Sequence, residues 1–160
     1  MIILGVDPGS LRTGYGAIES DGRRHRLLEK GTLIPPRKAS LPERLHFVRR
    51  GVGELIERLH PDILAVEDLF HAVNTRSAIV LAHVRGVIVE AGAAAGLSVQ
   101  AFPPTTVKLQ VTGFGLAEKA QVALMVTRLL QLSSEAEAGD AADALAVAIC
   151  HAHLHVSGAA

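Results

Sequence analysis

The chain has 160 residues, of which 49% are hydrophobic and 20% are charged. This size and composition predict one globular domain over residues 1–160, with the last few residues as a disordered tail, and exclude a largely disordered protein. The 16 Lys and Arg balance the 16 Asp and Glu, so no global charge favours nucleic acid or a membrane surface. The single cysteine, Cys150, excludes an internal disulfide and a cysteine-based zinc site.

The sequence offers no clear targeting signal. The N-terminal stretch MIILGVDPG lacks the basic start and the long apolar run of a signal peptide. Arg85 and Glu90 interrupt the longest apolar stretch, so no segment is expected to span a membrane. These features predict a cytoplasmic protein without a membrane partner.

Three short strands are predicted to open the fold. Residues 2–6 form a continuous apolar run that ends in the turn DPG at residues 7–9, the pattern of a buried strand. Residues 13–20 and 25–34 follow as two further strands, joined by a turn at residues 20–22. The first part of the chain therefore predicts a meander.

Helices alternate with two more strands in the rest of the chain. A capping box of Ser40 and Glu43 begins a helix that continues to His60, where Pro61 stops it. The remaining predicted elements are a strand at residues 63–66, a helix at about 75–95, a strand at 97–102, a short helix after residues 103–104, a helix at 117–132 and a last helix at 140 to about 155. This order predicts a mixed five-stranded α/β sheet with helices on both faces, the arrangement of a ribonuclease-H-like fold.

Four acidic residues stand at the ends of predicted elements. Asp7 and Glu67 follow buried strands, and functional side chains of open α/β sheets gather at such ends. Asp140 and Asp143 lie three residues apart in the first turn of the last helix. Their face of the helix continues into Val147, so both acids are expected to point along the protein body and not freely into water.

These four acids fit two interpretations. Helix capping explains one aspartate at a helix start, because acids favour its positive end by ~0.3 to 1 kcal/mol. A second inward acid beside Asp7 and Glu67 would destabilise the fold by charge repulsion unless a cation were bound. Converging carboxylates without cysteine suit Mg²⁺ or Mn²⁺ better than zinc. The residues alone leave capping and metal binding equally open.

Two further features stay ambiguous at this level. Asp68 competes with Glu67, because alternation along a strand puts one of the two inward without saying which. His151, His153 and His155 alternate near the end of the chain. Such spacing spreads side chains around a helix, which favours solvation, or a role as cations near the helix end, over metal binding.

Four segments together resemble the RuvC family of Holliday-junction resolvases. They are ILGVDPGSLRTGYG, AVEDLF, VKLQVTG with the AEK and QV that follow it, and DAADALAVAICH. They occur in the family's order from Ile2 to about His153, nearly the whole chain. Each motif is weak alone, and the four in order are specific. The resemblance implies a ribonuclease-H-like nuclease that cuts four-way DNA junctions.

The resemblance also implies the catalytic residues and the cofactor. Each of Asp7, Glu67, Asp140 and Asp143 falls on an acidic position of the family, which makes the four the catalytic metal site and assigns Glu67 over Asp68. The implied cofactor is Mg²⁺, two ions per site, with Mn²⁺ able to substitute. Some relatives carry histidine in place of Asp140, whereas all four groups are carboxylates in this chain.

Contacts with DNA and with other proteins follow from the same resemblance. Phe70 matches an aromatic residue near the junction crossover, and Lys108 and Lys119 match lysines near the scissile phosphate. A family lysine expected near Val73 is absent, and Arg76 is the basic residue nearby. The family acts as a homodimer that makes paired nicks, together with the branch-migration proteins RuvA and RuvB.

The first motif, DPGSLRTGYG, fits a rival interpretation as well. It resembles the phosphate loop of actin-like and sugar-kinase ATPases, although those proteins need two such domains and a longer chain. A related nuclease acting on structured RNA is a second alternative. A non-enzymatic junction-binding module is a third, which the intact set of four acids disfavours.

Overall fold

A five-stranded sheet forms the centre of the computed structural model, which describes residues 1–68, 75–133 and 139–157. The strands are β1 (Ile2–Asp7), β2 (Thr13–Ser20), β3 (His25–Leu33), β4 (Ile63–Glu67) and β5 (Ser98–Phe102). They lie in the order β3-β2-β1-β4-β5. β2 pairs antiparallel with β1 and β3, whereas β4 pairs parallel with β1 and β5. The predicted mixed sheet is confirmed; the predicted tail falls largely outside the described residues.

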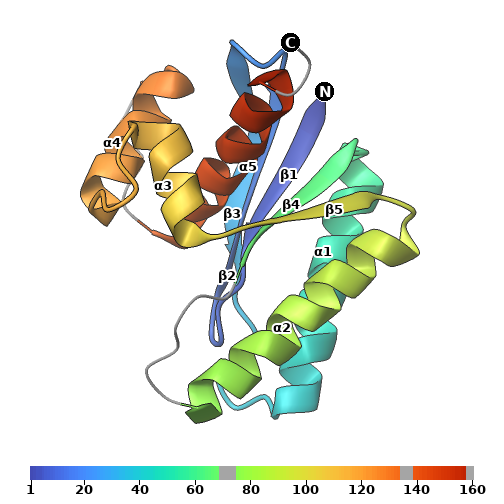
Figure 1. Cartoon of the computed structure of the whole chain (residues 1–160). Coiled ribbons are helices and arrows are strands. Elements are labelled where there is room, and N and C mark those ends of the chain that lie inside the picture. The colour runs from blue at the N-terminus through green and yellow to red at the C-terminus, as the bar shows by residue number, and fades with distance from the viewer. Residues whose placement is uncertain (69–74, 134–138, 158–160) are drawn as a thin grey trace.

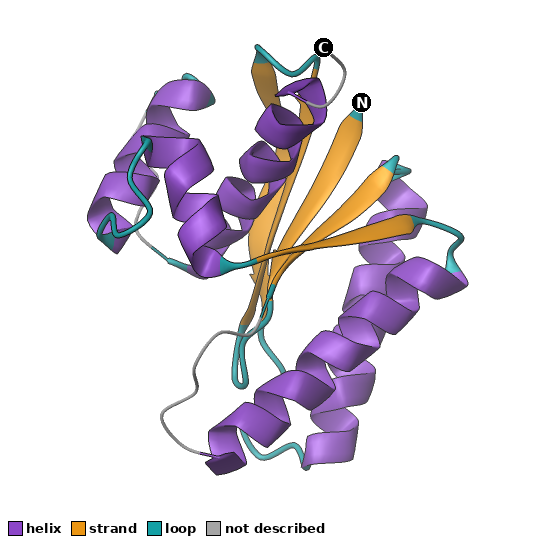
Figure 2. Ribbon diagram, in the orientation of Figure 1, coloured by secondary structure: helices purple, strands orange, loops and turns teal. Residues whose placement is uncertain are grey.

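Helices cover both faces of this sheet, as predicted (Figures 1 and 2). They are α1 (Leu41–Leu59), α2 (Thr75–Ala94), α3 (Pro104–Thr112), α4 (Lys119–Leu129) and α5 (Asp140–Ser157). α1 and α2 lie against one face, and α5 lies against the other with α3 and α4 beside it. The first four residues of β4 are apolar and buried on both faces of the sheet: Ile63 and Ala65 belong to the core under α5, and Leu64 and Val66 to the core under α1 and α2.

Local capping explains where two helices begin. The backbone N–H of Ser40 donates to the Glu43 carboxylate at 2.7 Å ahead of α1, as predicted from the capping box. Glu118 and Gln121 make the corresponding contact, at 2.8 Å, ahead of α4. α4 therefore begins at Lys119 and ends at Leu129, so it is shorter than the predicted helix at 117–132. Two residues after its end, the backbone of Gln131 is left-handed (φ 51°), which a continuing helix does not allow.

α5 lies unusually close to β1 and β2 because glycines face it. A Cβ added at Gly5 would collide with the backbone of Ala144, and one added at Gly14 would collide with the backbone of Asp140. The side chains of α5 from Ala144 to Cys150 are buried. The missing glycine side chains thus place the first turn of α5 directly over the ends of β1 and β2.

α2 differs from the other helices in its exposure. By length and composition it could cross a membrane, contrary to the expectation from Arg85 and Glu90, although the core helix of a soluble protein can have the same property. Both charges are paired, Arg85 with Asp68 and Glu90 with Arg49 at 2.9 Å. Only 22% of its apolar stretch is buried, and Ile79 is 53% exposed. The described part of the chain thus leaves much of this apolar helix uncovered.

Candidate active site

The strand pairing brings Asp7 and Glu67 side by side. β1 and β4 run parallel with Val6 opposite Val66, so the next residues, Asp7 and Glu67, leave the two strands together. On its other side Asp7 lies opposite Gly14 of β2. A hydrogen bond joins the two carboxyl groups, which requires a proton between them.

The electrostatics of this pair show concentrated negative charge. Burial raises the pKa of Asp7 to about 8, and the charges of Glu67 and Asp143 add to this effect. Burial also raises the pKa of Glu67, with Asp143 adding and Lys119 and Lys108 opposing. The two carboxyl groups therefore share one proton at neutral pH in the absence of another cation.

The first turn of α5 adds Asp143 to this cluster. Its carboxylate accepts a hydrogen bond from the Lys119 ammonium at 2.6 Å, and its side chain is only 18% exposed. The same contact raises the pKa of Lys119, so this lysine stays charged. α5 and α4 therefore deliver one negative and one positive group to the edge where Asp7 and Glu67 lie.

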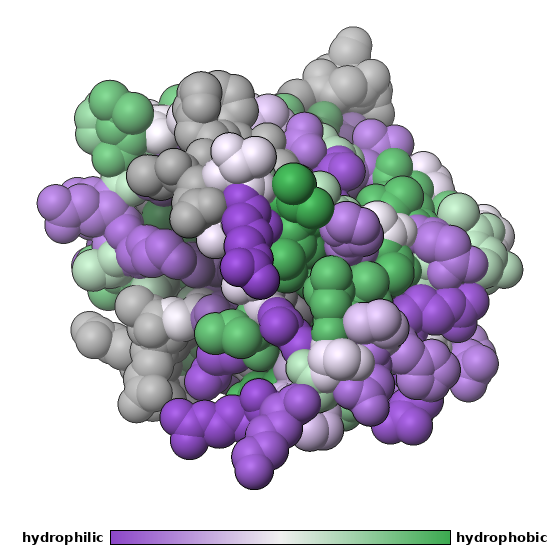
Figure 3. Space-filling view, turned by 90° about the horizontal axis from the view of Figure 1, so that it is seen from below, coloured by the Kyte–Doolittle hydropathy of each residue, from purple (hydrophilic) through white to green (hydrophobic). Residues whose placement is uncertain are grey.

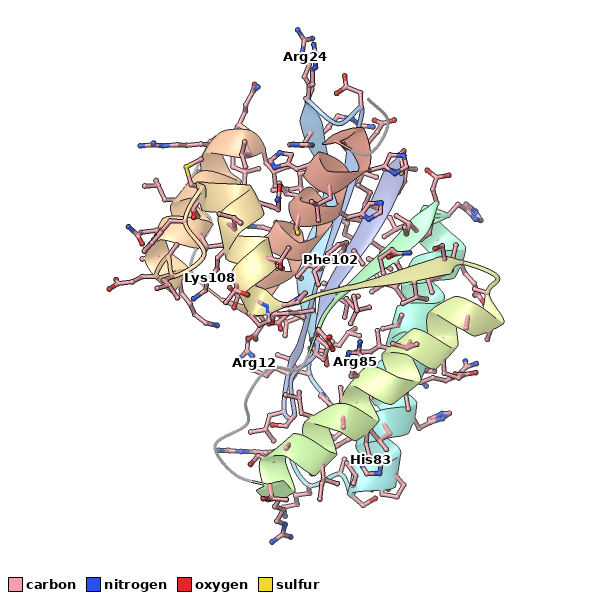
Figure 4. All side chains as sticks on the ribbon, viewed as in Figure 1. Arg12, Arg24, His83, Arg85, Phe102 and Lys108 are labelled. Atoms are coloured by element: carbon pink, nitrogen blue, oxygen red, sulfur yellow. The ribbon has the colours of Figure 1, made fainter. Side chains whose placement is uncertain are left out.

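Asp140, the first residue of α5, faces a different cation. The Nε of Arg12 donates to its carboxylate at 2.7 Å from the loop between β1 and β2. Figure 4 shows Arg12 at the lower end of the sheet. Arg12 was missed in the sequence interpretation: it lies inside the first motif, and nothing in the local pattern indicates a partner so distant along the chain.

The structure separates Glu67 from Asp68. Glu67 turns toward Asp7, whereas the carboxylate of Asp68 lies 3.1 Å from Arg85 of α2. The Asp68 backbone N–H donates to the carbonyl of Phe102, at the end of β5. Glu67 is thus the residue that joins the carboxylate cluster, in agreement with the assignment from the family motif.

Two lysines lie beside the cluster, as the motifs predicted. Lys108 of α3 and Lys119 of α4 line a cavity of about 220 Å³ together with Glu67 and Asp143. Seen from below, the molecule has hydrophobic side chains bordered by hydrophilic ones (Figure 3). The cavity therefore presents negative and positive groups to the same bound molecule.

Two further residues, Phe70 and Arg76, were predicted to contact DNA. Phe70 lies outside the described residues, as does Val73, near which the family lysine was expected. Arg76 is exposed in the first turn of α2, whose start lies well below the ends of β1 and β4 in Figure 1. Its contact with DNA stays a prediction.

The carboxylate cluster fits a hard divalent cation by its chemistry. Among the described residues no three His, Cys, Asp or Glu side chains stand ready-made around a metal position, and Asp140 and Asp143 instead face Arg12 and Lys119. The donors are all carboxylate oxygens, the ligands that Mg²⁺ and Mn²⁺ prefer. In the metal-free protein, the proton shared by Asp7 and Glu67 offsets the negative charge that such a cation would otherwise offset.

A mixed sheet of this strand order, with acidic residues at the ends of β1 and β4 and at the start of α5, defines a nuclease-type ribonuclease-H-like fold. The family model of the crossover junction endodeoxyribonuclease RuvC matches residues 3–151. The chain belongs to this family, as the four motifs predicted.

Individual relatives agree with this assignment. RuvC of Syntrophomonas wolfei is 44% identical over 155 residues, which cover 97% of this chain and 90% of the relative. The structure of Thermus thermophilus RuvC is 32% identical, with a TM-score of 0.90 over 99% of this chain and 97% of that one. A second structure of the T. thermophilus protein, in complex with a Holliday junction substrate, has a TM-score of 0.93 at the same identity and covers 99% and 96% of the two chains.

Proposed function

We propose that this chain is a junction-resolving endodeoxyribonuclease, which hydrolyses DNA phosphodiesters with divalent metal ions and makes paired nicks in four-way junctions during recombination and repair. The observation that carries the proposal is the convergence of Asp7 with Glu67 and Asp143, because the last two line one cavity with Lys108 and Lys119. It is supported by the T. thermophilus relative of the same fold, whose structure contains a Holliday junction.

The carboxylates are proposed as the ligands of the metal ions. Asp7, Glu67, Asp140 and Asp143 would hold two Mg²⁺ ions, with Mn²⁺ able to substitute. When bound, the ions activate a water and stabilise the departing 3′ oxygen. Asp7, which lies between Glu67 and Gly14 and is the most strongly perturbed acid, is the candidate for the ligand shared by both ions.

Lys119 and Lys108 are proposed to bind the phosphate. Their ammonium groups line the same cavity as Glu67 and Asp143, so a phosphodiester held there would face both charges. Positive groups fixed near the reacting phosphate stabilise the charge that grows during displacement.

Replacing Lys119 with methionine is expected to lower the rate of junction nicking roughly 10- to 100-fold, because the variant loses a charge aimed at the phosphate. Single-turnover cleavage of a labelled junction measures the effect, and Lys119→Arg should recover part of the rate. The control is Lys30→Met, which removes an exposed lysine of β3 and should cut normally. Equal rates for Lys119→Met and Lys30→Met would exclude this role.

A homodimer is proposed because a four-way junction has approximate two-fold symmetry, and paired cuts need two sites related by that symmetry. α2 is the candidate interface. Its outer face combines Ile79 with the small residues Ala82, Gly86 and Ala93, all exposed, and a Cβ added at Gly86 would meet nothing within 4 Å. Small and apolar residues on one helix face allow close packing against a second helix.

Light scattering at micromolar concentration is expected to give about twice the chain mass of 16.9 kDa. Ile79→Glu should shift the protein to the monomer mass, because it places a charge in the proposed interface. Leu116→Glu is the control, since Leu116 is 74% exposed in the loop before α4, away from α2. A wild-type monomer, or a dimer that tolerates Ile79→Glu, would contradict this interface.

The proposal also includes the protein's location in the cell and its partner proteins. The protein is proposed to act in the cytoplasm with the branch-migration proteins RuvA and RuvB, since a resolvase has to meet junctions where they are moved. The direct test of the function is incubation with a synthetic four-way junction and Mg²⁺ or Mn²⁺, followed by mapping of the nicks. Symmetric nicks in two opposing strands are expected, with duplex DNA and structured RNA left uncut.

A further inference from the structure

Two histidines face each other at the end of the molecule opposite the carboxylates. His25 begins β3, directly after the turn that carries Arg24 at the top of Figure 4, and His153 lies near the end of α5. Their Nε2 atoms are 3.1 Å apart, and the ring centroids are 5.1 Å apart. The pair thus joins two elements that are 128 residues apart in the chain.

The second nitrogen of each ring has its own hydrogen-bond partner. The Nδ1 of His153 lies 2.9 Å from the carbonyl oxygen of Gln110, in the last turns of α3. A carbonyl only accepts, so this Nδ1 carries the hydrogen, and the Nε2 of His153 in this tautomer is an acceptor that faces the Nε2 of His25. The Nδ1 of His25 lies 2.8 Å from the hydroxyl of Ser20, which can donate or accept.

The Ser20 hydroxyl allows His25 to adopt the same tautomer. Its oxygen has two lone pairs: the N–H of Gly22 uses one, at 2.9 Å, and an Nδ1–H of His25 can use the other. His25 would then also direct an Nε2 lone pair toward His153. A ring whose Nδ1–H is held by a carbonyl or hydroxyl, with its Nε2 turned to a shared point, has the arrangement found for metal-bound histidine.

We propose that His25 and His153 form a binding site for a borderline divalent cation such as Zn²⁺, separate from the carboxylate cluster. Two nitrogens on one tetrahedral zinc ion, each at about 2.0–2.1 Å, are about 3.3 Å apart, so the Nε2–Nε2 distance has to grow by a few tenths of an ångström and the rings have to turn until both lone pairs meet at the ion. The bound ion fastens the start of β3 to the end of α5. Without metal, the Nε2–H of His25 donates to the Nε2 of His153. When the ion binds, this proton moves to the Nδ1 of His25, and no proton is released.

The surroundings of His25 favour a neutral ring. Burial lowers the pKa of His25, with the proximity of His153 as the next cause, so the imidazole is a free base at neutral pH. His25 also lines a cavity of about 360 Å³ with Ser20, Asp21 and Arg24, so solvent reaches this ring. Among the described residues no third His, Cys, Asp or Glu completes a group of three, so water fills the other positions of the ion.

Calorimetric titration with Zn²⁺ in saturating Mg²⁺ tests the site, because Mg²⁺ occupies the carboxylates and binds imidazole poorly. We expect one zinc ion per chain and a higher melting temperature with zinc. His25→Gln and His153→Gln should each weaken zinc binding by about tenfold or more and remove the thermal shift. His83→Gln is the matched control, because His83 is an exposed histidine on α2. The result does not depend on the proposed nuclease function, since no activity is measured.

Zinc binding that survives both His25→Gln and His153→Gln, or the lack of any zinc-dependent thermal shift in the wild-type protein, would overturn the proposal. If either variant fails to fold without metal, wild-type crystals soaked in Zn²⁺ give the answer. An anomalous difference peak between the two Nε2 atoms supports the site, and its absence there contradicts it.

Discussion

The variant Asp7→Asn is expected to lose junction nicking by at least about 100-fold, the scale of removing one electrostatic group from a preorganised site. Asparagine keeps the shape and polarity of the side chain but deletes the negative charge that holds a hard cation. Asp7 lies at the centre of the cluster, next to Glu67 and within the influence of Asp143, so no neighbouring acid can take its place.

Substitution of the other three acids should also lower the nicking rate. Glu67→Gln, Asp140→Asn and Asp143→Asn each remove a proposed ligand, and each is expected to cut the nicking rate sharply. Junction binding should persist in all four variants, because DNA affinity comes mainly from contacts between basic groups and phosphates. The variants should therefore shift a labelled junction in a gel without cutting it.

Glu19→Gln is the matched control for these substitutions. Glu19 is an exposed carboxylate on β2 that pairs with Arg26 at 2.6 Å, so its change also removes an ion-paired acid but away from the cluster. It should nick at the wild-type rate. Wild-type rates for two or more of the four site variants in Mg²⁺ would show that the carboxylates are not the catalytic site.

Elements with strong local signals were predicted well from the sequence. β1 and β4 are unbroken apolar runs, and α1 has a capping box at its start and Pro61 after its end, so periodicity and capping alone located them. α4 was predicted too long because Ala117 and Leu132 continue the apolar pattern, whereas the contact of Glu118 with Gln121 sets where the helix begins. Apolar spacing marks a buried face and does not by itself mark helix ends.

Pairings between distant residues could not be predicted. The Arg12 contact with Asp140 depends on glycines that admit α5 close to β2, and this is a property of the packed sheet. The histidines of α5 show the same limit. Their spacing does spread them around the helix, but solvation is wrong for His151, which is buried, and His153 meets His25. Burial of a polar side chain is decided by which element covers it, and local sequence does not contain that information.

The stability of the metal-free protein should fall as pH rises, because the pKa of Asp7 is raised from 3.8 to about 8 by burial and then by the charges of Glu67 and Asp143. The unfolded chain releases this proton near pH 4, whereas the folded protein keeps it until about pH 8. The folded state thus binds more protons between these values, and the free energy of unfolding decreases with pH there. The stabilisation is complete below about pH 4 and is lost as pH passes 8.

Comparison with Asp7→Asn isolates this effect from other titrating groups, such as His25 and His151, whose lowered pKa values act in the opposite direction near pH 6. In EDTA, the free energy of unfolding of Asp7→Asn minus that of the wild type should increase by up to about 1.4 kcal/mol per pH unit between pH 4 and 8. Urea unfolding followed by circular dichroism measures both. Saturating Mg²⁺ should stabilise the wild type most at high pH, because the cation then replaces the proton that the carboxylates have lost. A difference that does not change with pH would mean that Asp7 and Glu67 share no proton in the metal-free protein.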